Sequence, residues 1–348
     1  MRIARSRRAV LGDLVAVAGI ATGFASVWPR AARSASIVRV LLDRRPDGAA
    51  APFLVAQARG LFRTEGVDVT ADTANGSQDA IERVAHGDAD IAIADFDALI
   101  RFRDTSGAAA LKAIFIVFNR TPYALVARKS RGVATLADMP GKTLGIAEGD
   151  LAIRLWPAVA KQNGIDLSQI KIERMAAAVR GPMLSAGQVD ATTGLSYGTA
   201  VDLRDRGVPA TDLMVFQFAD YGCQCYGQAV IVSPQLLADH PDAAAAFVRG
   251  LAAGIRFAAK EPAKAADAVL AQMDGGARDV ELERLRIVLT DNIVTAEVKR
   301  NGLGAIDPAR FDVSVQQIGV DYKFRKIPVA SDLFDPGFLP SAAQRKII

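Results

Sequence analysis

Histidine and cysteine are both scarce in this sequence, with two of each among 348 residues. A zinc centre needs three or four ligands drawn mainly from Cys and His, and Cys223 and Cys225 have no histidine near them in the chain. The segment Gly194-Leu195-Ser196-Tyr197-Gly198 has the spacing of a hydrolase nucleophile elbow. Of the two histidines, His86 precedes this segment and His240 lies at a helix boundary. We therefore predict no metal site, no cofactor and no catalytic residues.

Net charge is also nearly absent outside the N-terminal segment. The whole chain carries +4, but residues 1–36 contain six arginines and one aspartate. The remaining residues hold 36 Lys and Arg against 37 Asp and Glu. This balance leaves no electrostatic footprint for nucleic acid. We expect a monomer without a nucleic-acid partner.

No apolar stretch of the sequence is long enough to cross a bilayer, which takes about 20 residues. The most apolar part of the N-terminus, Asp13–Val27, falls short of that length. It follows a twin-arginine pattern at Ser6–Leu11 and precedes small-residue cleavage sites within Ala32–Ser36. Residues 1–36 are therefore predicted to be a twin-arginine-like signal peptide, cleaved at 35–37 to release a soluble periplasmic protein. The phenylalanine that often follows the twin arginines is missing, which leaves the Sec route open.

Strands and helices alternate along the chain, which is typical of a mainly parallel sheet covered by helices. Strands are expected at Ile37–Leu42, Val67–Thr70 and Ala89–Ala94, with helices between them. From Thr135 to Asp166 the order turn, strand, polar loop and helix begins again, which indicates a second lobe. A weak echo supports this reading, because Gly87-Asp88-Ala89-Asp90-Ile91 and Gly187-Gln188-Val189-Asp190-Ala191 share one pattern.

Beyond Ser233 the pattern becomes helical, with helices expected after Pro241 and Pro262 and over Val280–Ile293 and Pro308–Val320. A chain that leaves a lobe once and returns once makes a two-strand hinge. We place the crossings near Leu125–Arg128 and Gln228–Val232. The expected division assigns residues 37–127 and 229–348 to lobe 1 and residues 128–228 to lobe 2.

The order of several segments resembles that of periplasmic solute-binding proteins of ABC importers, and most closely the group that binds sulfonates, taurine, nitrate and thiamine-pyrimidine precursors. The matching segments are Pro52-Phe53-Leu54-Val55-Ala56, Gly60-Leu61-Phe62, Glu65-Gly66-Val67-Asp68-Val69, Gly87-Asp88-Ala89-Asp90, Leu136-Ala137-Asp138-Met139-Pro140-Gly141-Lys142, Asp332-Leu333-Phe334-Asp335 and Phe338-Leu339-Pro340. The resemblance implies an α/β, type II-like periplasmic binding protein with two lobes, a two-strand hinge and a ligand cleft between the lobes. It implies a membrane permease as partner and no enzymatic activity.

The segment Cys223-Gln224-Cys225 keeps an alternative open. It lies where thiamine-pyrimidine synthases, which resemble these binding proteins, carry a cysteine-rich motif. The alternative function is therefore a synthase-like enzyme that uses Cys223 and Cys225. A disulfide across one residue would be strained, and an export signal argues against a synthase that acts on a cytoplasmic cofactor. Small residues at a cleft or hinge remain the other interpretation.

Ligands of such folds bind at the carboxyl ends of strands, which selects the loops that supply the site. A neutral or cationic planar ligand is favoured over a sulfonate or nitrate, because these loops carry more carboxylates than cations and stand beside aromatic rings. Arg44, Arg45 and Arg120 could serve an anion instead. The predicted ligand-binding residues are Asp43, Phe53, Ser77, Asp95, Phe96, Glu148, Asp150, Ser196, Tyr197, Asp220, Tyr221 and Tyr226.

Overall fold

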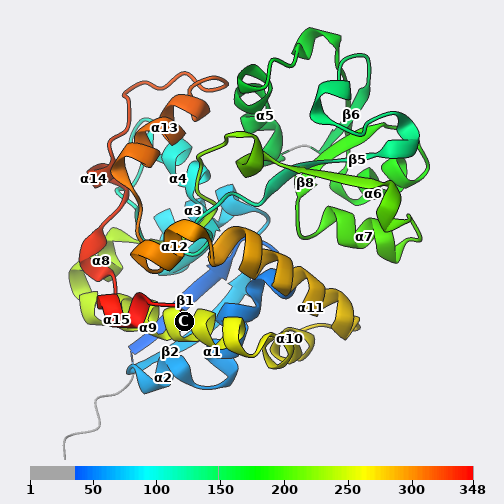
Figure 1. The fold of residues 1–348 in the computed structure, drawn as a ribbon. Helices are drawn as coiled ribbons and strands as arrows, with labels where there is room; N and C mark the ends of the chain where they lie inside the picture. The colour runs from blue at the N-terminus through cyan, green and yellow to red at the C-terminus, as the bar shows by residue number, and fades with distance from the viewer. Residues whose placement is uncertain (1–35, 148, 348) are drawn as a thin grey trace, which may run out of the picture. The chain divides into compact units, whose positions relative to one another are not determined.

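Two five-stranded sheets organise residues 36–147 and 149–347, the part of the chain that the computed structural model describes (Figure 1). The signal-peptide prediction and Glu148 lie outside the described residues. The first sheet has the order β2-β1-β3-β10-β4. Its strands are β1 (Ser36–Leu42), β2 (Val67–Thr73), β3 (Ile91–Asp95), β4 (Lys112–Ile116) and β10 (Gln228–Val232). β1, β2 and β3 are parallel, whereas β10 is antiparallel to both β3 and β4.

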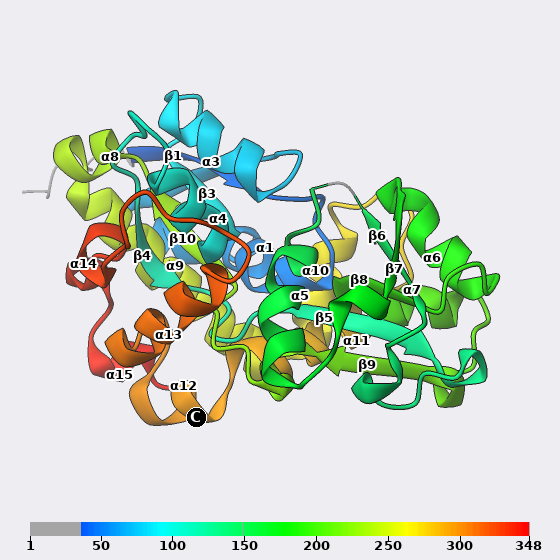
Figure 2. The same ribbon diagram turned by 90° about the horizontal axis from the view of Figure 1, so that it is seen from above.

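The second sheet repeats this arrangement with the order β7-β6-β8-β5-β9. Its strands are β5 (Tyr123–Arg128), β6 (Thr143–Ala147), β7 (Lys171–Met175), β8 (Ala191–Leu195) and β9 (Leu213–Gln217). β6, β7 and β8 are parallel, and β5 is antiparallel to β8 and β9. Each sheet is therefore mixed, with the one reversed strand in the fourth position. In Figure 2, the labelled strands of the first sheet (β1, β3, β4 and β10) lie on the left and those of the second sheet on the right.

The sequence echo has a structural cause in two equivalent aspartates. The carboxylate of Asp90 accepts the backbone N–H of Arg39 at 2.8 Å, and the Asp90 N–H donates to the Arg39 carbonyl. In the second sheet, Asp190 accepts the N–H of Thr143 at 2.9 Å and donates its own N–H to the Thr143 carbonyl. Each aspartate directly precedes the central strand of its sheet, β3 or β8, and joins it to the neighbouring strand, β1 or β6. The two lobes are alike in topology, as the echo predicted.

Side chains alternate across β1 and so feed two different cores. Val38, Val40 and Leu42 pack among α1 (Ala51–Ala58), α9 (Pro241–Lys260) and α10 (Pro262–Leu270), whereas Leu41 faces α3 and α4. The other helices of the first lobe are α2 (Leu61–Thr64), α3 (Ser77–Ala85), α4 (Phe96–Arg103), α8 (Pro234–Asp239), α11 (Arg278–Ile287), α12 (Ala296–Asn301), α13 (Pro308–Ile318), α14 (Ala330–Leu333) and α15 (Ala342–Arg345).

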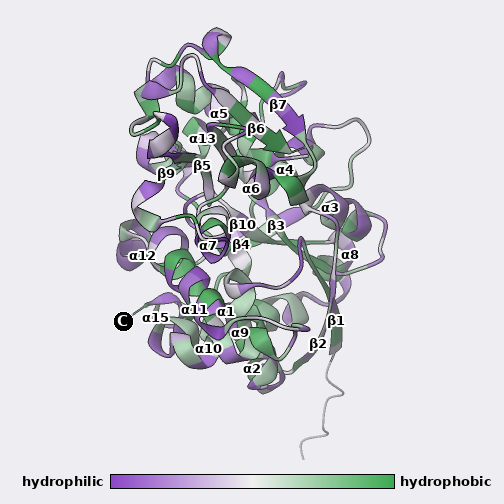
Figure 3. Cartoon of the chain, turned by 90° about the vertical axis from the view of Figure 1, so that its right-hand side faces the viewer, coloured by the Kyte–Doolittle hydropathy of each residue, from purple (hydrophilic) through white to green (hydrophobic). Residues whose placement is uncertain are grey.

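The second sheet is covered by α5 (Leu151–Gln162), α6 (Ala177–Ser185) and α7 (Thr199–Asp205). Apolar side chains of α5 join the core that contains Leu41, and α13 packs on α5. The hydrophobic core therefore continues from the first sheet to the second. The edge strand β7 is mostly exposed, and Figure 3 shows it in both hydrophilic and hydrophobic colours. No helix in residues 36–147 and 149–347 has the length and apolarity to cross a bilayer.

The two crossings between the sheets run side by side, and each lies a few residues before the place that the sequence analysis gave it. All of β5 belongs to the second sheet and all of β10 to the first, so neither Leu125–Arg128 nor Gln228–Val232 is a crossing, and the chain first crosses at residues 117–122. The return runs through residues 222–227 and ends where β10 begins. We call these segments the first linker and the return linker. Gly227 donates its N–H to the Phe118 carbonyl at 2.9 Å, and a Cβ at Gly227 would come within 2.9 Å of the Phe118 Cβ.

A π-helix follows α11 and holds the first linker. It spans Val288–Ile293, so the single helix expected over Val280–Ile293 changes type partway. Asn292 in this turn donates through its side chain to the carbonyls of Arg120 and Thr121, both at 3.3 Å. π-helical turns occur mostly at functional positions. Here the turn ties the C-terminal helices to the segment about which the lobes would move.

Candidate functional site

A cavity of about 400 Å³ opens between the carboxyl ends of the strands of the two sheets. From the first lobe it is lined by the loop after β1 and the start of α3. From the second lobe it is lined by Tyr123 and by the ends of β6 and β8 with the first turns of α5 and α6. The lining residues are Arg44, Asn75, Gly76, Ser77, Gln78, Tyr123, Ala147, Gly149, Asp150, Leu151, Arg154, Ala177, Arg180, Gly194 and Leu195. We call this space the inter-lobe cavity.

Asp43 organises the first-lobe side of the cavity. It follows β1 and is 1% exposed. Its carboxylate accepts the Ser77 hydroxyl at 2.7 Å, the Gln228 amide at 2.8 Å, and the Nε and Nη2 of Arg44 at 3.0 and 2.8 Å. These donors satisfy the hydrogen-bonding capacity of the buried carboxylate. Asp43 therefore holds Arg44 and Ser77 in place at the cavity and is itself covered by them.

Asp95 is linked to the same network through Ser77. The Asp95 N–H donates to the Ser77 hydroxyl at 3.1 Å, and the Asp95 carboxylate caps α4 by accepting the N–H groups of Asp97 and Ala98. Tyr123 donates its hydroxyl to Asp95 at 3.0 Å. Burial raises the pKa of Asp95 to about 6, although these hydrogen bonds oppose the rise. Asp95 thus anchors Tyr123, which lines the cavity, but Asp95 itself is not a lining residue.

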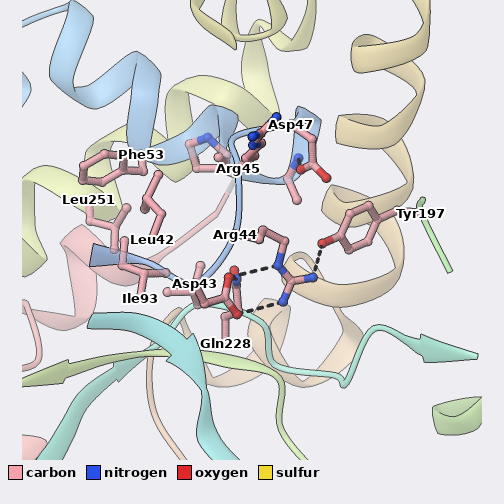
Figure 4. A pocket seen from close by; sticks show the side chains of 14 residues that line it. Leu42, Asp43, Arg44, Arg45, Asp47, Phe53, Ile93, Tyr197, Gln228 and Leu251 are labelled. Carbon is pink, nitrogen blue, oxygen red and sulfur yellow. Dashed lines mark hydrogen bonds and ion pairs between the residues drawn. The ribbon is translucent and has the colours of Figure 1, made fainter. Parts of the chain in front are cut away.

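Arg44 connects the two lobes. Its Nη1 donates to the hydroxyl of Tyr197, which follows β8, at 3.1 Å, and Figure 4 shows this contact beside the Asp43 ion pair. Behind Arg44 lies a second, small cavity of about 30 Å³, close to the size of one water molecule. Asp47 lines this small cavity, and burial raises its pKa to about 6. Arg44 lines both cavities, so it divides the inter-lobe cavity from the space behind it.

Asp150 has the equivalent role in the second lobe. Its carboxylate caps α5 by accepting the Ala152 N–H at 2.9 Å. It also accepts Nη1 of Arg180 at 2.6 Å and the hydroxyl of Thr193. Arg180 comes from the second turn of α6, and Arg154 from α5 also lines the cavity. Each lobe therefore presents an arginine that a buried or half-buried aspartate holds in position.

Of the predicted residues, five meet around the inter-lobe cavity and its supporting network: Asp43, Ser77, Asp95, Asp150 and Tyr197. Phe53 and Phe96 are placed in the cores instead. Phe53 packs against Phe62 and Phe247, and Phe96 packs against Tyr226 and Phe311. Phe53 also borders the small cavity behind Arg44.

Apart from Glu148, which lies outside the described residues, the remaining predicted residues do not line the inter-lobe cavity. Asp220 forms an ion pair with Arg120 of the first linker, and Tyr221 packs edge-on against Phe216. Tyr226 accepts the Asp307 N–H through its hydroxyl at 2.8 Å. Ser196 is 3% exposed, and its hydroxyl has no hydrogen-bond partner in residues 36–147 and 149–347. A buried hydroxyl without a base beside it does not have the arrangement of a hydrolase nucleophile.

The sequence analysis missed four residues of the site: Tyr123, Arg154, Arg180 and Gln228. Gln228 was read as part of a strand, although strand ends are where such sites form, and Tyr123 likewise begins a strand, β5. Arg180 had no recognisable signal, because Gly181 and Pro182 break the pattern of α6. Arg154 lies on an amphipathic helix, α5, where an arginine most often faces solvent, so its sequence position did not mark it as a site residue.

Comparison with known proteins identifies the family. The family model described as NMT1/THI5 like matches residues 48–265, well over half of the chain. The chain belongs to the NMT1/THI5-like family. This assignment confirms the resemblance that the sequence segments indicated.

Relatives of this NMT1/THI5-like chain include both binding proteins and enzymes. The riboflavin-binding protein RibY of Chloroflexus aurantiacus is 25% identical over 257 residues, which cover 69% of this chain and 67% of RibY. The 4-amino-5-hydroxymethyl-2-methylpyrimidine phosphate synthase of Legionella pneumophila is 24% identical over 234 residues, covering 66% and 72%.

Among solved structures, the ligand-binding component of an ABC-type import system from Staphylococcus aureus, with zinc bound, superposes with a TM-score of 0.67. It is 15% identical, and the match covers 89% of this chain and 99% of that one. At this identity the likeness shows the fold alone. The NMT1/THI5-like chain has the fold of periplasmic binding proteins, as predicted.

Proposed function

We propose that this protein captures a small organic ligand that bears an anionic group, and delivers it to the membrane permease of an ABC importer. The signal-peptide pattern of residues 1–36 would place the protein in the periplasm. We propose that it acts there as a monomer and catalyses no reaction. The observation that carries the proposal is the composition of the inter-lobe cavity, which both lobes line. A ligand there would be buried only when the lobes approach, so each lobe would supply part of the affinity.

The charge of the described lining favours an anion. Arg44, Arg154 and Arg180 line the cavity, against Asp150 as the one described carboxylate. Arg44 is paired with Asp43 and Arg180 with Asp150, so Arg154 supplies the remaining charge of the described lining. Asp43 and Asp95, which the sequence analysis counted toward an acidic site, are hydrogen-bonded behind the lining. Arginine presents several N–H donors in a planar group that matches carboxylate, sulfonate or phosphate oxygens. We therefore favour an anionic group over the neutral or cationic ligand expected from the sequence.

Two helix N-termini support the same conclusion. The first turns of α3, at Gly76 and Ser77, and of α6, at Ala177, both line the cavity. Neither helix has a side-chain cap, so its first N–H groups are available to a ligand. Such N–H groups, together with the helix dipole, favour anions. Tyr123 is the one aromatic ring among the lining residues that the structure describes, and it offers a flat surface to an organic portion of the ligand.

The linkers provide the means of capture. Two hydrogen-bonded segments, 117–122 and 222–227, connect lobes that share no strand. Rotation about such a pair of segments opens and closes a cleft without changing either sheet. A ligand that contacts both lobes would bind the closed state more tightly and so shift the population toward it. The permease would then recognise the closed, loaded form.

A synthase-like enzyme remains the second candidate, because some relatives are named as pyrimidine phosphate synthases and two cysteines are present. Neither His86 nor His240 lines the inter-lobe cavity. Incubation of the purified protein with a vitamin precursor, followed by mass spectrometry, separates the two functions. Reversible binding without product supports a carrier, whereas a pyrimidine product or tightly bound iron supports the enzyme.

Calorimetric titration with matched ligand pairs tests the proposed charge. Each pair would share an organic group and differ in one anionic substituent, for example an alkyl sulfonate and its alcohol, or a pyrimidine phosphate and its alcohol. We expect the anionic member of at least one pair to bind, and Arg180→Gln to weaken that binding at least tenfold. The control is Arg249→Gln, which removes an arginine paired with Glu65 far from the cavity lining. Preferential binding of the neutral members would contradict the proposal.

A further inference from the structure

The two cysteines of the chain lie together on the return linker and not in the inter-lobe cavity. Both are free and buried, with 3% exposure for Cys223 and 0% for Cys225. Cys223 nevertheless lines a separate cavity of about 430 Å³ between the linkers and the C-terminal helices. We call this space the linker cavity. Cys225 lies deeper and donates its thiol to the Ser314 carbonyl at 3.9 Å. One thiol thus borders an open space and the other lies behind it.

A buried carboxyl group stands next to the inner thiol. Asp97 on α4 is 3% exposed, and neither of its oxygens has a hydrogen-bond partner among the described residues. Burial, together with the charges of Asp95 and Cys223, raises the pKa of Asp97 well above its usual value. A buried carboxyl group without a structural partner needs an explanation. Its neighbours are Asp95, Arg101 and the two thiols, and a carboxyl group with a raised pKa can exchange protons with a thiol.

The surroundings make the two thiols unlike each other. The neighbouring Cys225 thiol lowers the pKa of the Cys223 thiol, and the Arg310 guanidinium adds to this effect. The proximity of Cys223, together with burial, raises the pKa of Cys225 well above its usual value. Thiolates are the nucleophiles in disulfide chemistry. The outer thiol, with its lowered pKa, is suited to attack first. The inner thiol, with its raised pKa, can attack only after a base has removed its proton.

We propose that Cys223 and Cys225 form a redox-active dithiol, in which Cys223 attacks a small disulfide that enters the linker cavity, Cys225 completes the exchange, and Asp97 accepts the Cys225 proton. This activity is separate from ligand capture in the inter-lobe cavity.

The exchange takes place in two steps, and its electrons and protons balance. In the first, the Cys223 thiolate attacks one sulfur of the entering disulfide, forms a mixed disulfide and expels one thiolate. In the second, Asp97 takes the proton of Cys225, whose sulfur attacks Cys223 and expels the second thiolate. The dithiol loses two electrons and two protons, and the small disulfide becomes two thiols. The Cys223–Cys225 ring would be strained, and strained disulfides are readily reduced again.

The linker cavity also indicates the class of disulfide. Its lining carries Arg120, Lys299 and Arg310 against one carboxylate, that of Glu297. Arg310 and Glu297 form an ion pair at 2.7 Å, and Arg120 is paired with Asp220, so Lys299 sets the remaining charge of the described lining. A small disulfide that carries carboxylates fits this lining better than a neutral one.

The experiment uses the reduced, folded protein and oxidised glutathione as probe, with intact-mass measurement and assay of the released thiol. The wild type is expected to lose two hydrogens, release two glutathione molecules and retain no adduct. Cys225→Ser is expected to keep one glutathione on Cys223, and Cys223→Ser to remain unmodified. An adduct that persists on the wild type would overturn the proposal. So would modification of Cys223→Ser, or a wild type whose thiols react only as fast as the protein unfolds.

Two further variants separate chemistry from structure. Asp97→Asn is expected to slow the second step at least tenfold and to leave adduct formation on Cys223 unchanged, whereas an unchanged second step would overturn the role of Asp97.

Lys299→Gln, on an exposed side chain, is expected to reduce the preference for oxidised glutathione over the neutral hydroxyethyl disulfide. Equal rates for the two disulfides in the wild type would overturn the assigned substrate class.

Discussion

At the scale of single residues, the site depends on aspartates whose carboxylates form ion pairs with the arginines beside them. Asp43 and Asp150 each hold an arginine at the cavity, while Asp95 is buried with a pKa of about 6. The sequence could predict Asp43, Ser77 and Asp95, because strand ends mark them. It could not predict the charge that the cavity presents, since that depends on which carboxylates are covered by partners. That is why the ligand charge that we propose from the structure differs from the one expected from the sequence.

Asp95 gives a testable pH dependence. Its folded pKa of about 6 lies above the usual 3.8, so the native state holds this proton more tightly than the unfolded state does. The resulting stabilisation is complete below about pH 4 and is lost as the pH rises through about 6. It amounts to on the order of 2–3 kcal/mol. Asp95→Asn keeps an N-cap side chain and should remove this share of the pH dependence in denaturant unfolding between pH 4 and 7. An unchanged slope would refute the assignment.

At the scale of elements, the two sheets have the same strand arrangement, and an equivalent aspartate joins β1 to β3 and β6 to β8. The sequence could predict the repeated strand–helix order, because turns and apolar periods are local signals. It could not assign β5 to a sheet, since a short buried strand reads the same whichever neighbours it pairs with. Sheet membership is decided by long-range pairing, in this case with β8 and β9. The same limit explains why the first crossing was predicted several residues too late.

The equivalence of Asp90 and Asp190 can be tested by substitution. Each carboxylate accepts a backbone N–H of the neighbouring parallel strand, β1 or β6, and its removal leaves that donor without its partner. Asp90→Ala and Asp190→Ala should each lower the free energy of unfolding by about 1–3 kcal/mol. Asp88→Ala is the matched control, because Asp88 is exposed and its side chain makes no hydrogen bond among the described residues. Chemical denaturation would contradict this account if Asp190→Ala behaved like the control.

At the scale of the whole molecule, the linkers, the π-helix and the continuous core decide how the two sheets can move. Residues 117–122 and 222–227 are bonded to each other, and Asn292 fixes the first of them. The family resemblance was readable from the order of segments. The positions of the cavities were not, because they arise where residues from distant parts of the chain meet.

The central claim is that the inter-lobe cavity holds a small ligand with an anionic group. Native mass spectrometry of the unheated protein, purified from exporting cells, tests this most directly. The account predicts one copurified organic anion per chain, absent from Arg180→Gln and present in Arg249→Gln. A neutral or cationic ligand, or an anion retained equally by both variants, would contradict it.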